Sequence, residues 1–315
     1  MSAWKPSANV AQLRARSDLL SEVRAFFAVR GVMEVDTPAL GQYAITDPNI
    51  ELFEVSMGDS SRFLQSSPEY AMKRLLAFGS GDIYQLGKVF RSGEHGRKHN
   101  PEFAMLEWYR TQWTHYRLMR EVADLICPIL NLDSWQVWSI EALFDHFCRI
   151  NPHDASIEQL QARALELGVE PVGDLEKLDY VDLLMTHVVE PGITDWGLVF
   201  VTDFLMEQAA LSRLIDRGDK VVAARFEAFV GGVELANGYW EELNPETLRQ
   251  RFESDNAVRR QRGQATRDID PRFMHAMNAG LPDCSGVALG FDRLLMLAQG
   301  HTDMSTILPF TWSQA

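Results

Sequence analysis

The sequence predicts an α+β fold in which an antiparallel sheet is flanked by helices. From Leu198 onward apolar residues recur with a period of two in the segments VFVTDF and RFEAFV, and Gly231-Gly232 separates two strands as a two-residue hairpin turn does. Helical patterns precede and follow these strands, and no strand is followed by a glycine-rich phosphate loop of the Walker or dinucleotide type. This order favours hairpin-linked strands over a doubly wound parallel sheet.

The first expected element is an amphipathic helix that begins at Ser17. Gly31 stands where such a helix stops, and the segment VMEVDTP then alternates as a strand until Pro38. The apolar positions that define the buried face of this helix are Leu20, Val23, Phe26 and Phe27.

Helix-starting signals recur through the middle of the chain. Ser67, Pro68 and Glu69 combine an N-cap, a proline at the first helical position and an acid in the first turn. The segment 139–197 carries no recognisable motif, so we expect a mainly helical insertion there. Three further helices are predicted: from about Thr114 toward Pro128, from Ser139 onward, and from the capping box of Ser156 and Gln159 to Gly168.

The last third of the chain continues the alternation of strands and helices. After the hairpin at Gly231-Gly232, the dipeptide Asn237-Gly238 predicts a second tight feature, a bulge or a turn. Asn244 and Pro245 then start a helix that ends at Gly263, with arginines near its C-terminal end.

Composition limits the classes of protein that the chain can represent. With 315 residues, of which 46% are hydrophobic, it can bury a large core, and we expect one catalytic domain over residues 1–315. No segment approaches the ~20 apolar residues that cross a bilayer, and no signal peptide is visible, so a cytoplasmic protein is expected. The net charge of −14 argues against a large nucleic-acid surface. Three widely spaced cysteines predict reduced thiols.

Two distant segments carry the strongest motifs. FRSGEHGRKHNPEF (Phe90 to Phe103) and GVALGFDR (Gly286 to Arg293) are similar to the second and third motifs of class II aminoacyl-tRNA synthetases, in the family's order. The predicted helix, strand and proline near the N-terminus resemble the family's first motif, which implies a homodimer. The resemblance covers nearly the whole chain and implies the class II catalytic fold.

Within this family the chain is most similar to the lysine branch. HNPEFAMLEWYR (His99 to Arg110) and GGVELANGYWEE (Gly231 to Glu242) resemble truncated lysyl-tRNA synthetase paralogues that attach (R)-β-lysine to a lysine of elongation factor P. The first motif already starts near Ser17, so no anticodon-binding domain is expected and no tRNA anticodon recognition with it. The resemblance therefore implies a ligase that uses ATP and Mg²⁺ to form an amide bond on a protein.

The resemblance also implies an ATP site built around two arginines. A guanidinium group donates two parallel hydrogen bonds to phosphate and keeps its charge. Arg91 corresponds to the residue that holds the α-phosphate and the substrate carboxylate, and Arg293 to the one that holds the γ-phosphate; both are the catalytic candidates. The full set of expected ATP-binding residues is Arg91, Ser92, Gly93, Glu94, Asn100, Phe103, Glu234, Leu235, Gly290 and Arg293.

One departure from the family concerns the adenine contacts. The family places a glutamate two positions after the arginine, whereas this chain has the order Arg91-Ser92-Gly93-Glu94. We expect Glu94, or backbone groups near Ser92 and Gly93, to replace that glutamate. Phe103 is expected to stack on adenine.

Glu234 and Glu241 are the expected Mg²⁺ ligands, because one or two carboxylates with phosphate and water oxygens commonly hold this ion. A separation of seven puts them on opposite faces of a regular strand. They can share one pocket only if the strand is irregular, which we expect at Asn237-Gly238. The alternative is two solvated acids at a sheet edge.

The amino-acid substrate of the lysine branch carries two ammonium groups, which two carboxylates can bind. Ala288 stands where lysyl-tRNA synthetases have glycine, and the added methyl group is expected to favour a lysine isomer. The expected substrate-binding residues are Ser67, Pro68, Glu69, Tyr109, Glu241 and Ala288.

Three points stay open at this level. His95 and His99 fit either a metal pair or a mobile basic loop with Arg97 and Lys98, and Gly96 favours the loop. The chain could instead charge a tRNA or a small molecule with lysine. It could also be a catalytically silent regulatory paralogue, although Arg91, Arg293 and the acids are present.

Overall fold

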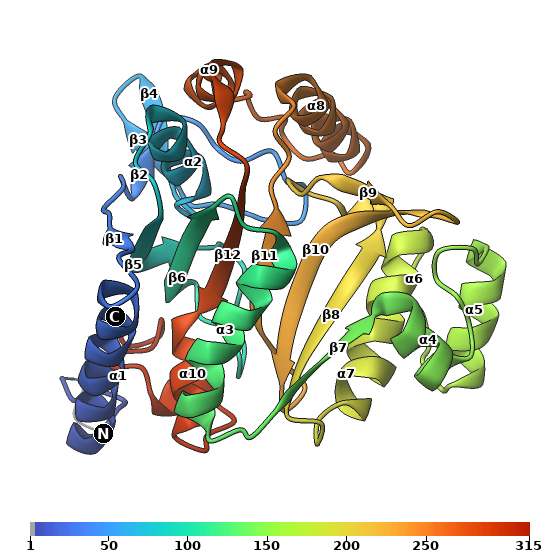
Figure 1. The fold of residues 1–315 in the computed structure, drawn as a ribbon, viewed down its shortest axis with the longest axis horizontal. Helices are drawn as coiled ribbons and strands as arrows, with labels where there is room; N and C mark the ends of the chain where they lie inside the picture. Colours follow the sequence, from blue (N-terminus) through green and yellow to red (C-terminus); the bar gives the residue numbers. More distant parts are fainter. Residues whose placement is uncertain (1–3) are drawn as a thin grey trace. The chain divides into compact units, whose positions relative to one another are not determined.

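The structure is a computed structural model that describes residues 4–315. These residues form two compact units (Figure 1). The first unit contains the chain up to Trp113 together with Glu242–Ala315, and the second contains Thr114–Glu241. Mostly antiparallel strands with flanking helices build both units, so the predicted α+β class is confirmed.

The main sheet of the first unit has four strands in the order β1-β5-β6-β12. β1 (Met33–Glu34) runs parallel to β5 (Ile83–Phe90), while β6 (Glu102–Thr111) and β12 (Cys284–Gly290) are antiparallel to their neighbours. A small second sheet has the order β2 (Leu40–Gly41), β4 (Ser60–Leu64) and β3 (Glu54–Met57). The helices of this unit are α1 (Val10–Ala28), α2 (Glu69–Phe78), α8 (Pro245–Gln261), α9 (Pro271–Gly280) and α10 (Phe291–Ala298).

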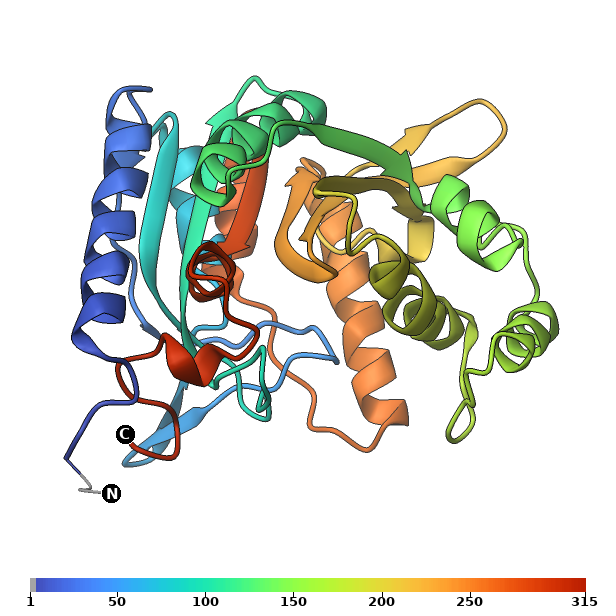
Figure 2. The same ribbon diagram turned by 90° about the horizontal axis from the view of Figure 1, so that it is seen from below.

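The two faces of the main sheet in the first unit differ in chemistry. Phe27 of α1 stacks on Tyr84, with ring centroids 4.4 Å apart, and meets Trp108 edge-on at 5.4 Å. Figure 2 shows α1 running alongside this sheet. On the opposite face Glu107 pairs in register with Gln85 on one side and with Ala288 on the other. Buried polar groups on that face mark it as the functional side.

The N-terminal helix begins earlier than the sequence suggested. α1 starts at Val10, where Asn9 and Gln12 form a capping box, and Ser17 lies inside the helix. The prediction of a cap at Ser17 was therefore wrong, because the reciprocal Asn9–Gln12 bonds satisfy the free N–H groups seven residues upstream. Gly31 follows the helix in the left-handed region, as expected.

The second unit is a strand layer with helices. Its strands follow the order β11 (Val233–Trp240), β10 (Val221–Val230), β8 (Leu198–Leu205) and β7 (Trp135–Ser139), and β9 (Leu214–Asp216) also pairs with β10. The expected caps at Thr114, Ser139 and Ser156 are confirmed. The helices are α3 (His115–Leu130), α4 (Ile140–Cys148), α5 (Ile157–Glu166), α6 (Lys177–Leu184), a π-helical turn (Met185–Val189) and α7 (Glu190–Gly192).

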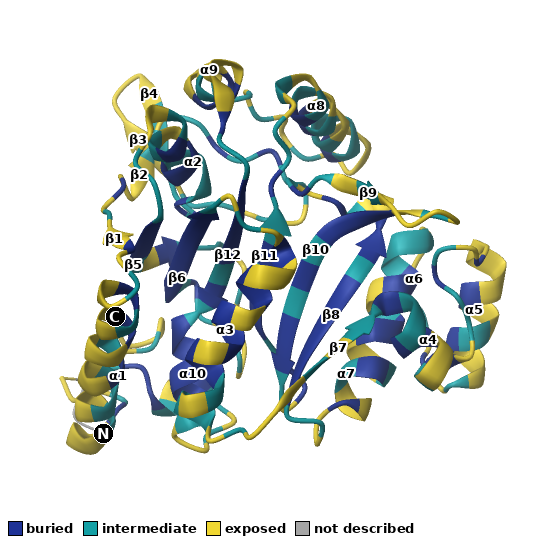
Figure 3. Cartoon of the chain, viewed as in Figure 1, coloured by how far each residue is buried: buried dark blue, intermediate teal, exposed yellow. Residues whose placement is uncertain are grey.

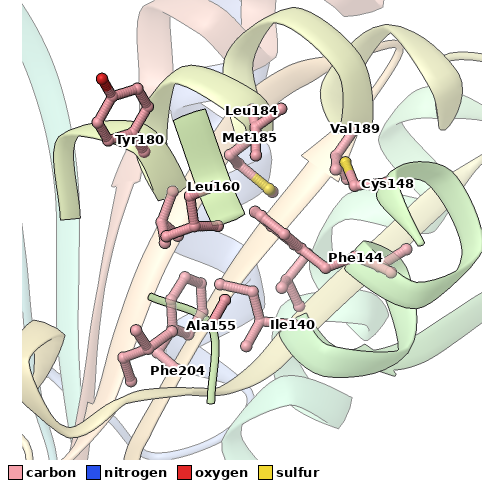
Figure 4. Close-up of a cluster of buried hydrophobic side chains, with 14 of the residues drawn as sticks. Ile140, Phe144, Cys148, Ala155, Leu160, Tyr180, Leu184, Met185, Val189 and Phe204 are labelled. Atoms are coloured by element: carbon pink, nitrogen blue, oxygen red, sulfur yellow. The ribbon is translucent and has the colours of Figure 1, made fainter. Parts of the chain in front are cut away.

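A hydrophobic core joins the helices of residues 140–193 to strands of the second unit (Figure 4). Phe144 of α4, Leu160 of α5 and Leu184 of α6 are fully buried there, and Phe204 of β8 contributes from the strand layer. Figure 3 shows the same burial along β8 and β10. This helical segment therefore has the packing of a folded part of the protein. No helix of residues 4–315 is long and apolar enough to cross a membrane.

The predicted hairpin at Gly231-Gly232 is confirmed. Val230 pairs with Val233, and both glycines have positive φ, 61° and 66°. A two-residue turn of this kind needs the left-handed region at both central positions, which glycine enters without steric cost.

Replacing Gly232 with alanine is expected to destabilise the protein more than replacing Gly231. A methyl group at Gly232 meets the carbonyl oxygen of Glu190 at 2.9 Å and the hydroxyl of Thr194 at 3.0 Å, whereas nothing lies within 4 Å of one at Gly231. Gly231→Ala should cost about 1–2 kcal/mol for the left-handed backbone. Gly232→Ala should cost about 1–3 kcal/mol more through overpacking. Urea unfolding of the two variants measures the difference, and equal losses would contradict it.

The tight feature predicted at Asn237-Gly238 is wrong in position. Asn237 and Gly238 pair regularly with Glu227 and Phe226 inside β11. The irregularity lies two residues earlier in β11. Ala228 pairs with Ala236 and Phe229 pairs with Glu234, so Leu235 is the extra residue of a bulge.

Candidate active site

The loop between β5 and β6, residues 91–101, carries the first catalytic candidate. Arg91 follows the last residue of β5, and its Nη1 lies 3.3 Å from Oε1 of Glu94. Its guanidinium carbon lies 5.3 Å from the centre of the Phe103 ring. Arg91 and Phe103 therefore form one surface at the end of the sheet. A charged plane next to an aromatic ring fits a phosphate group attached to a stacked base.

Arg293, the second catalytic candidate, contacts the same loop from α10. Its Nε donates to the carbonyl oxygen of Lys98 at 3.3 Å, and its Nη2 lies 2.7 Å from Nε2 of His99. Arg91 thus begins the loop, and Arg293 contacts the loop near its other end, at Lys98 and His99. Gly290 precedes α10 and pairs with Met105 of β6.

Asp292 fixes the start of α10 in this position. Its carboxylate accepts a hydrogen bond from the Ala104 N–H at 2.7 Å and forms an ion pair with Arg16 of α1. The aspartate side chain is 1% exposed, so both bonds are shielded from water. The buried carboxylate, held by one backbone N–H and one guanidinium group, thus fixes the first turn of α10, which carries Arg293.

The remaining predicted residues of the loop have structural partners of their own. Asn100 donates through Nδ2 to the carbonyl oxygen of Glu102 and accepts the Trp312 N–H at 3.1 Å. Ser92 donates its N–H to the carbonyl oxygen of Glu51, while Gly93 has φ 85°. Glu94 is held by Arg91. The Glu94 side chain is thus close to Arg91, and its contact with adenine stays a prediction.

His95 and His99 have different partners in this loop. The His95 ring lies 6.3 Å from the Trp312 ring, and His99 contacts Arg293. The segment is an irregular loop with a bridge between Gly96 and His99, not a helix. This geometry supports the loop interpretation over a metal pair.

Residues of the expected substrate pocket gather on the polar face of the first unit's sheet. The Ser67 hydroxyl donates to Glu107 Oε2 at 2.7 Å, and the Tyr109 hydroxyl donates to Oε1 at 2.8 Å. Ser67 also accepts the N–H of Glu69, so it links the start of α2 to the sheet. Pro68 stands at the N-cap of α2, so the prediction of Ser67 as the N-cap was one residue too early. The predicted substrate residues Ser67, Pro68, Glu69 and Tyr109 are therefore brought together.

Glu107 is the residue of this pocket that sequence reasoning missed. It is 2% exposed and lies at the centre of the arrangement. The available signal was a carboxylate in the apolar run FAMLEWY, because a lone acid in a buried strand needs a function or a partner.

The electrostatics of the pocket favour a cationic ligand. Burial, together with the nearby carboxylate of Glu69, raises the pKa of Glu107 to about 8, although Ser67, Tyr109 and Lys73 oppose the shift. Lys73 is bound to Glu69 at 2.7 Å. Two carboxylates at one buried site repel each other, and an ammonium group relieves that repulsion. Ala288 pairs directly with Glu107, so its methyl group adjoins the pocket.

The predicted metal ligands lie in the second unit. The Leu235 bulge places Glu234 opposite Phe229, on the same face of the hairpin as Arg225, Glu227 and Asn237. Asn237, Tyr239 and Glu241 are alternate residues, so Glu241, directly after the end of β11, falls on this same face. The irregularity needed to bring Glu234 and Glu241 to one side therefore exists, at Leu235.

Glu227 is a further acid on this face that sequence reasoning missed. Its pKa is raised by burial and by the carboxylates of Glu234 and Asp182, while Arg225 lowers it. Arg225 binds Glu227 and donates through Nε to Asn237 Oδ1 at 3.2 Å. Carboxylate oxygens are the donors that a hard divalent cation prefers. Glu227 and Glu234 share one face of the hairpin, while residues 4–315 contain no group of three or more His, Cys, Asp or Glu side chains that could hold a metal ion. The available signal was the segment Arg225-Phe226-Glu227, because its alternation puts two charged residues on one face of the strand.

Glu241 is buried, with 1% of the residue exposed, and its backbone is held by Arg213. The Arg213 N–H donates to the Trp240 carbonyl at 2.8 Å, and its Nε donates to the Glu241 carbonyl at 3.0 Å. The guanidinium group also lies 4.0 Å from the Trp240 ring centre. The position of Glu241 is therefore fixed from two sides of its peptide.

These motifs and their geometry agree with a comparison against protein families. The model described as tRNA synthetases class II (D, K and N) matches residues 3–314. The chain belongs to the class II tRNA synthetases. The family predicted from the two arginine motifs is thus confirmed, and the antiparallel strands with flanking helices suit a class II synthetase domain.

Individual relatives of the chain carry a more specific name than the family model does. A protein of Photorhabdus laumondii named elongation factor P–(R)-β-lysine ligase is 43% identical, over 99% of this chain and 98% of the relative. Proteins of the same name from Vibrio parahaemolyticus and Yersinia enterocolitica are each 44% identical; the alignments cover 98% and 99% of this chain and 98% of each relative. The resemblance to the truncated lysyl-tRNA synthetase paralogues is therefore confirmed.

Proposed function

We propose that this protein activates (R)-β-lysine with ATP and transfers the aminoacyl group to a lysine side chain of elongation factor P. The observation that carries the proposal is the 43–44% identity, over nearly the full length, to proteins named for that reaction. The carboxylate pocket around Glu107 adds support, because it suits a substrate with ammonium groups.

In the first step a carboxylate oxygen of the amino acid attacks the α-phosphorus of ATP, and the bond to pyrophosphate breaks. Arg91 binds the α-phosphate and the attacking carboxylate, and Arg293 binds the γ-phosphate. Fixed positive charge at these positions stabilises the negative charge that develops on the phosphate oxygens. Phe103 stacks on adenine, and Glu69 with Glu107 orients the ammonium groups.

In the second step the ε-amine of the acceptor lysine attacks the carbonyl carbon of the mixed anhydride. An amide bond forms, the bond to the AMP oxygen breaks, and the amine loses a proton to solvent. No nucleophile of the enzyme is required. A Mg²⁺ ion, held by Glu234 with Glu227 or Glu241, supplies positive charge to the phosphates when bound.

The direct test is to incubate the protein with ATP, (R)-β-lysine and elongation factor P and to measure the mass of the factor. One added lysyl residue is expected, and no addition with Arg293→Ala as control. An unchanged mass with the wild-type protein would reject the acceptor.

The synthetase family match also favours a second candidate, an enzyme that charges a tRNA or a small molecule with lysine. Amino-acid-dependent pyrophosphate exchange separates the two functions. A preference for (R)-β-lysine over α-lysine supports the proposed function, and the opposite preference supports the second candidate.

Ala288→Gly is expected to shift that preference toward α-lysine. The alanine methyl group adjoins Glu107 across the β6–β12 pair, and its removal enlarges the pocket on that side. A change of one methyl group is worth about 1–3 kcal/mol of discrimination, or about 10- to 200-fold in the ratio of kcat/KM values. Exchange rates with both substrates measure the ratio. An unchanged ratio would show that Ala288 does not set the choice.

We further propose a cytoplasmic homodimer that associates through the N-terminal helix and strand. Val29 is 81% exposed and Met33 is 49% exposed at this position, and apolar side chains of this kind favour a partner surface. Light scattering of the purified protein tests the dimer, and a monomer at micromolar concentration would reject it.

A further inference from the structure

The C-terminal segment, residues 303–315, lies against the loop 91–101 that carries Arg91. The Met304 N–H donates to the Arg97 carbonyl at 2.7 Å, and the Trp312 N–H donates to Asn100 Oδ1 at 3.1 Å. Met304 and Trp312 are eight residues apart in the segment, and the loop residues that they bind, Arg97 and Asn100, are three residues apart. The segment therefore spans the loop.

Trp312 adds ring contacts to this arrangement. Its ring centre lies 6.3 Å from that of His95 on the loop and 5.5 Å from that of Phe53. Phe53 immediately precedes β3 of the small sheet. The tryptophan thus bridges the loop and a second part of the first unit through its side chain, while its backbone holds Asn100.

The segment is itself anchored on the body of the first unit. Ile307 and Leu308 are 0% and 3% exposed. The Pro309 carbonyl accepts the Ser7 N–H at 2.9 Å, and Gln314 accepts the Ser7 hydroxyl. Figure 2 shows the C-terminus close to the beginning of α1. Because both sides of Trp312 are fixed, the loop is held by an anchored segment and not by a free tail.

We propose that Trp312 is a positioning residue that holds the loop 91–101 in the conformation that binds ATP. The inference rests on the proposed function, since it requires the loop to bind the nucleotide. Trp312 touches no reacting group. It acts through Asn100 and His95. Both belong to the loop that begins at Arg91 and that Arg293 contacts at Lys98.

The first test is pyrophosphate exchange by the full-length protein with Trp312→Ala and Trp312→Phe. The alanine variant keeps the backbone bond to Asn100 and loses the ring contacts with His95 and Phe53, so KM for ATP should rise about five- to tenfold, the equivalent of one aromatic contact, with KM for (R)-β-lysine unchanged. The phenylalanine variant keeps a ring and should recover most of the affinity. Trp4→Ala is the matched control, because Trp4 is 75% exposed in the same unit and its ring contacts Lys5.

The second test is limited trypsin digestion at the Arg97–Lys98 bond. The carbonyl of this bond accepts the Met304 N–H, and Arg97 is exposed. Trp312→Ala should speed cleavage there while leaving the thermal unfolding midpoint and cleavage at other sites unchanged. A variant that lacks residues 310–315 should show the same change in greater measure.

Three outcomes would overturn the proposal. They are an unchanged KM for ATP in Trp312→Ala, an equal rise in both KM values together with a lower unfolding midpoint, and unaltered cleavage at Arg97. Absence of exchange in the wild-type protein would instead reject the proposed function. In that case the digestion experiment still decides whether Trp312 holds the loop.

Discussion

Arg293→Ala is expected to lower the rate of ATP–pyrophosphate exchange about 100- to 1000-fold, the range found when one fixed donor to a developing negative charge is removed. Arg293 lies at the start of α10, oriented by the buried Asp292, and reaches the loop residues Lys98 and His99. Its loss should leave the fold intact, because the ion pair of Asp292 with Arg16 remains.

Arg74→Ala is the matched control for this experiment. Arg74 is an exposed arginine of α2 in the same unit, and its removal should leave the exchange rate within a factor of about two, as surface substitutions do. Arg293→Lys should restore only part of the rate, since one ammonium group cannot reproduce the two parallel bonds of a guanidinium group. Full activity of Arg293→Ala would remove the basis of the proposed ATP site.

Glu107→Gln is expected to raise KM for the amino acid about 10- to 100-fold while leaving KM for ATP unchanged. The amide has one oxygen, so it keeps one of the two hydrogen bonds accepted from Ser67 and Tyr109, and it carries no charge to pair with an ammonium group. A charge-assisted bond is worth about 1.5–3 kcal/mol. Steady-state exchange at varied amino acid and fixed ATP measures the effect. Equal changes in both KM values would point to a structural role for Glu107.

The pH dependence of amino-acid binding provides an independent check on Glu107. Its pKa is raised to about 8 by burial and by Glu69, so at lower pH it carries a proton that must leave before an ammonium group can bind. KM for the amino acid should therefore fall as pH rises from about 6 to 8, and Glu107→Gln should lose this dependence. The same raised pKa affects the stability of the fold in the opposite direction: stability falls as pH rises. The raised pKa contributes stability below the ordinary pKa near 4.5, and this is lost as pH rises through about 8.

The parts of the fold that could be predicted from sequence are those set by neighbouring residues. Thr114, Ser139 and Asn244 cap helices because each side chain accepts a backbone N–H within its own first turn. The Gly231-Gly232 hairpin follows equally from local backbone geometry. Such signals need no knowledge of the rest of the chain.

The prediction at Asn237-Gly238 failed because tertiary contacts override a local preference. The Asn237 side chain accepts a hydrogen bond from Arg225, and Gly238 pairs with Phe226, so strand pairing keeps this dipeptide extended. The bulge falls instead at Leu235, where no turn-forming residue marks it. Register between strands depends on both partners and cannot be derived from one of them.

The candidate site was predicted where family motifs name its residues and missed where packing decides. Arg91, Phe103 and Arg293 were expected from the family motifs, and in the structure Arg293 of α10 contacts the loop that begins at Arg91. Glu107 and Glu227 escaped because acids in apolar strands resemble core positions. Their role follows from which residues pair with them across the sheet.

The single extra residue in β11 has a consequence for how this gene can change. Removing the codon for Leu235 would restore strict alternation and still leave Glu234 opposite Phe229, so the Glu234 carboxylate would stay on the face of Glu227. Exchange of Leu235 for another apolar residue would keep the carboxylate where it is. Natural variants of this protein should therefore tolerate either substitution or loss of the residue at position 235 as far as the placement of Glu234 beside Glu227 is concerned.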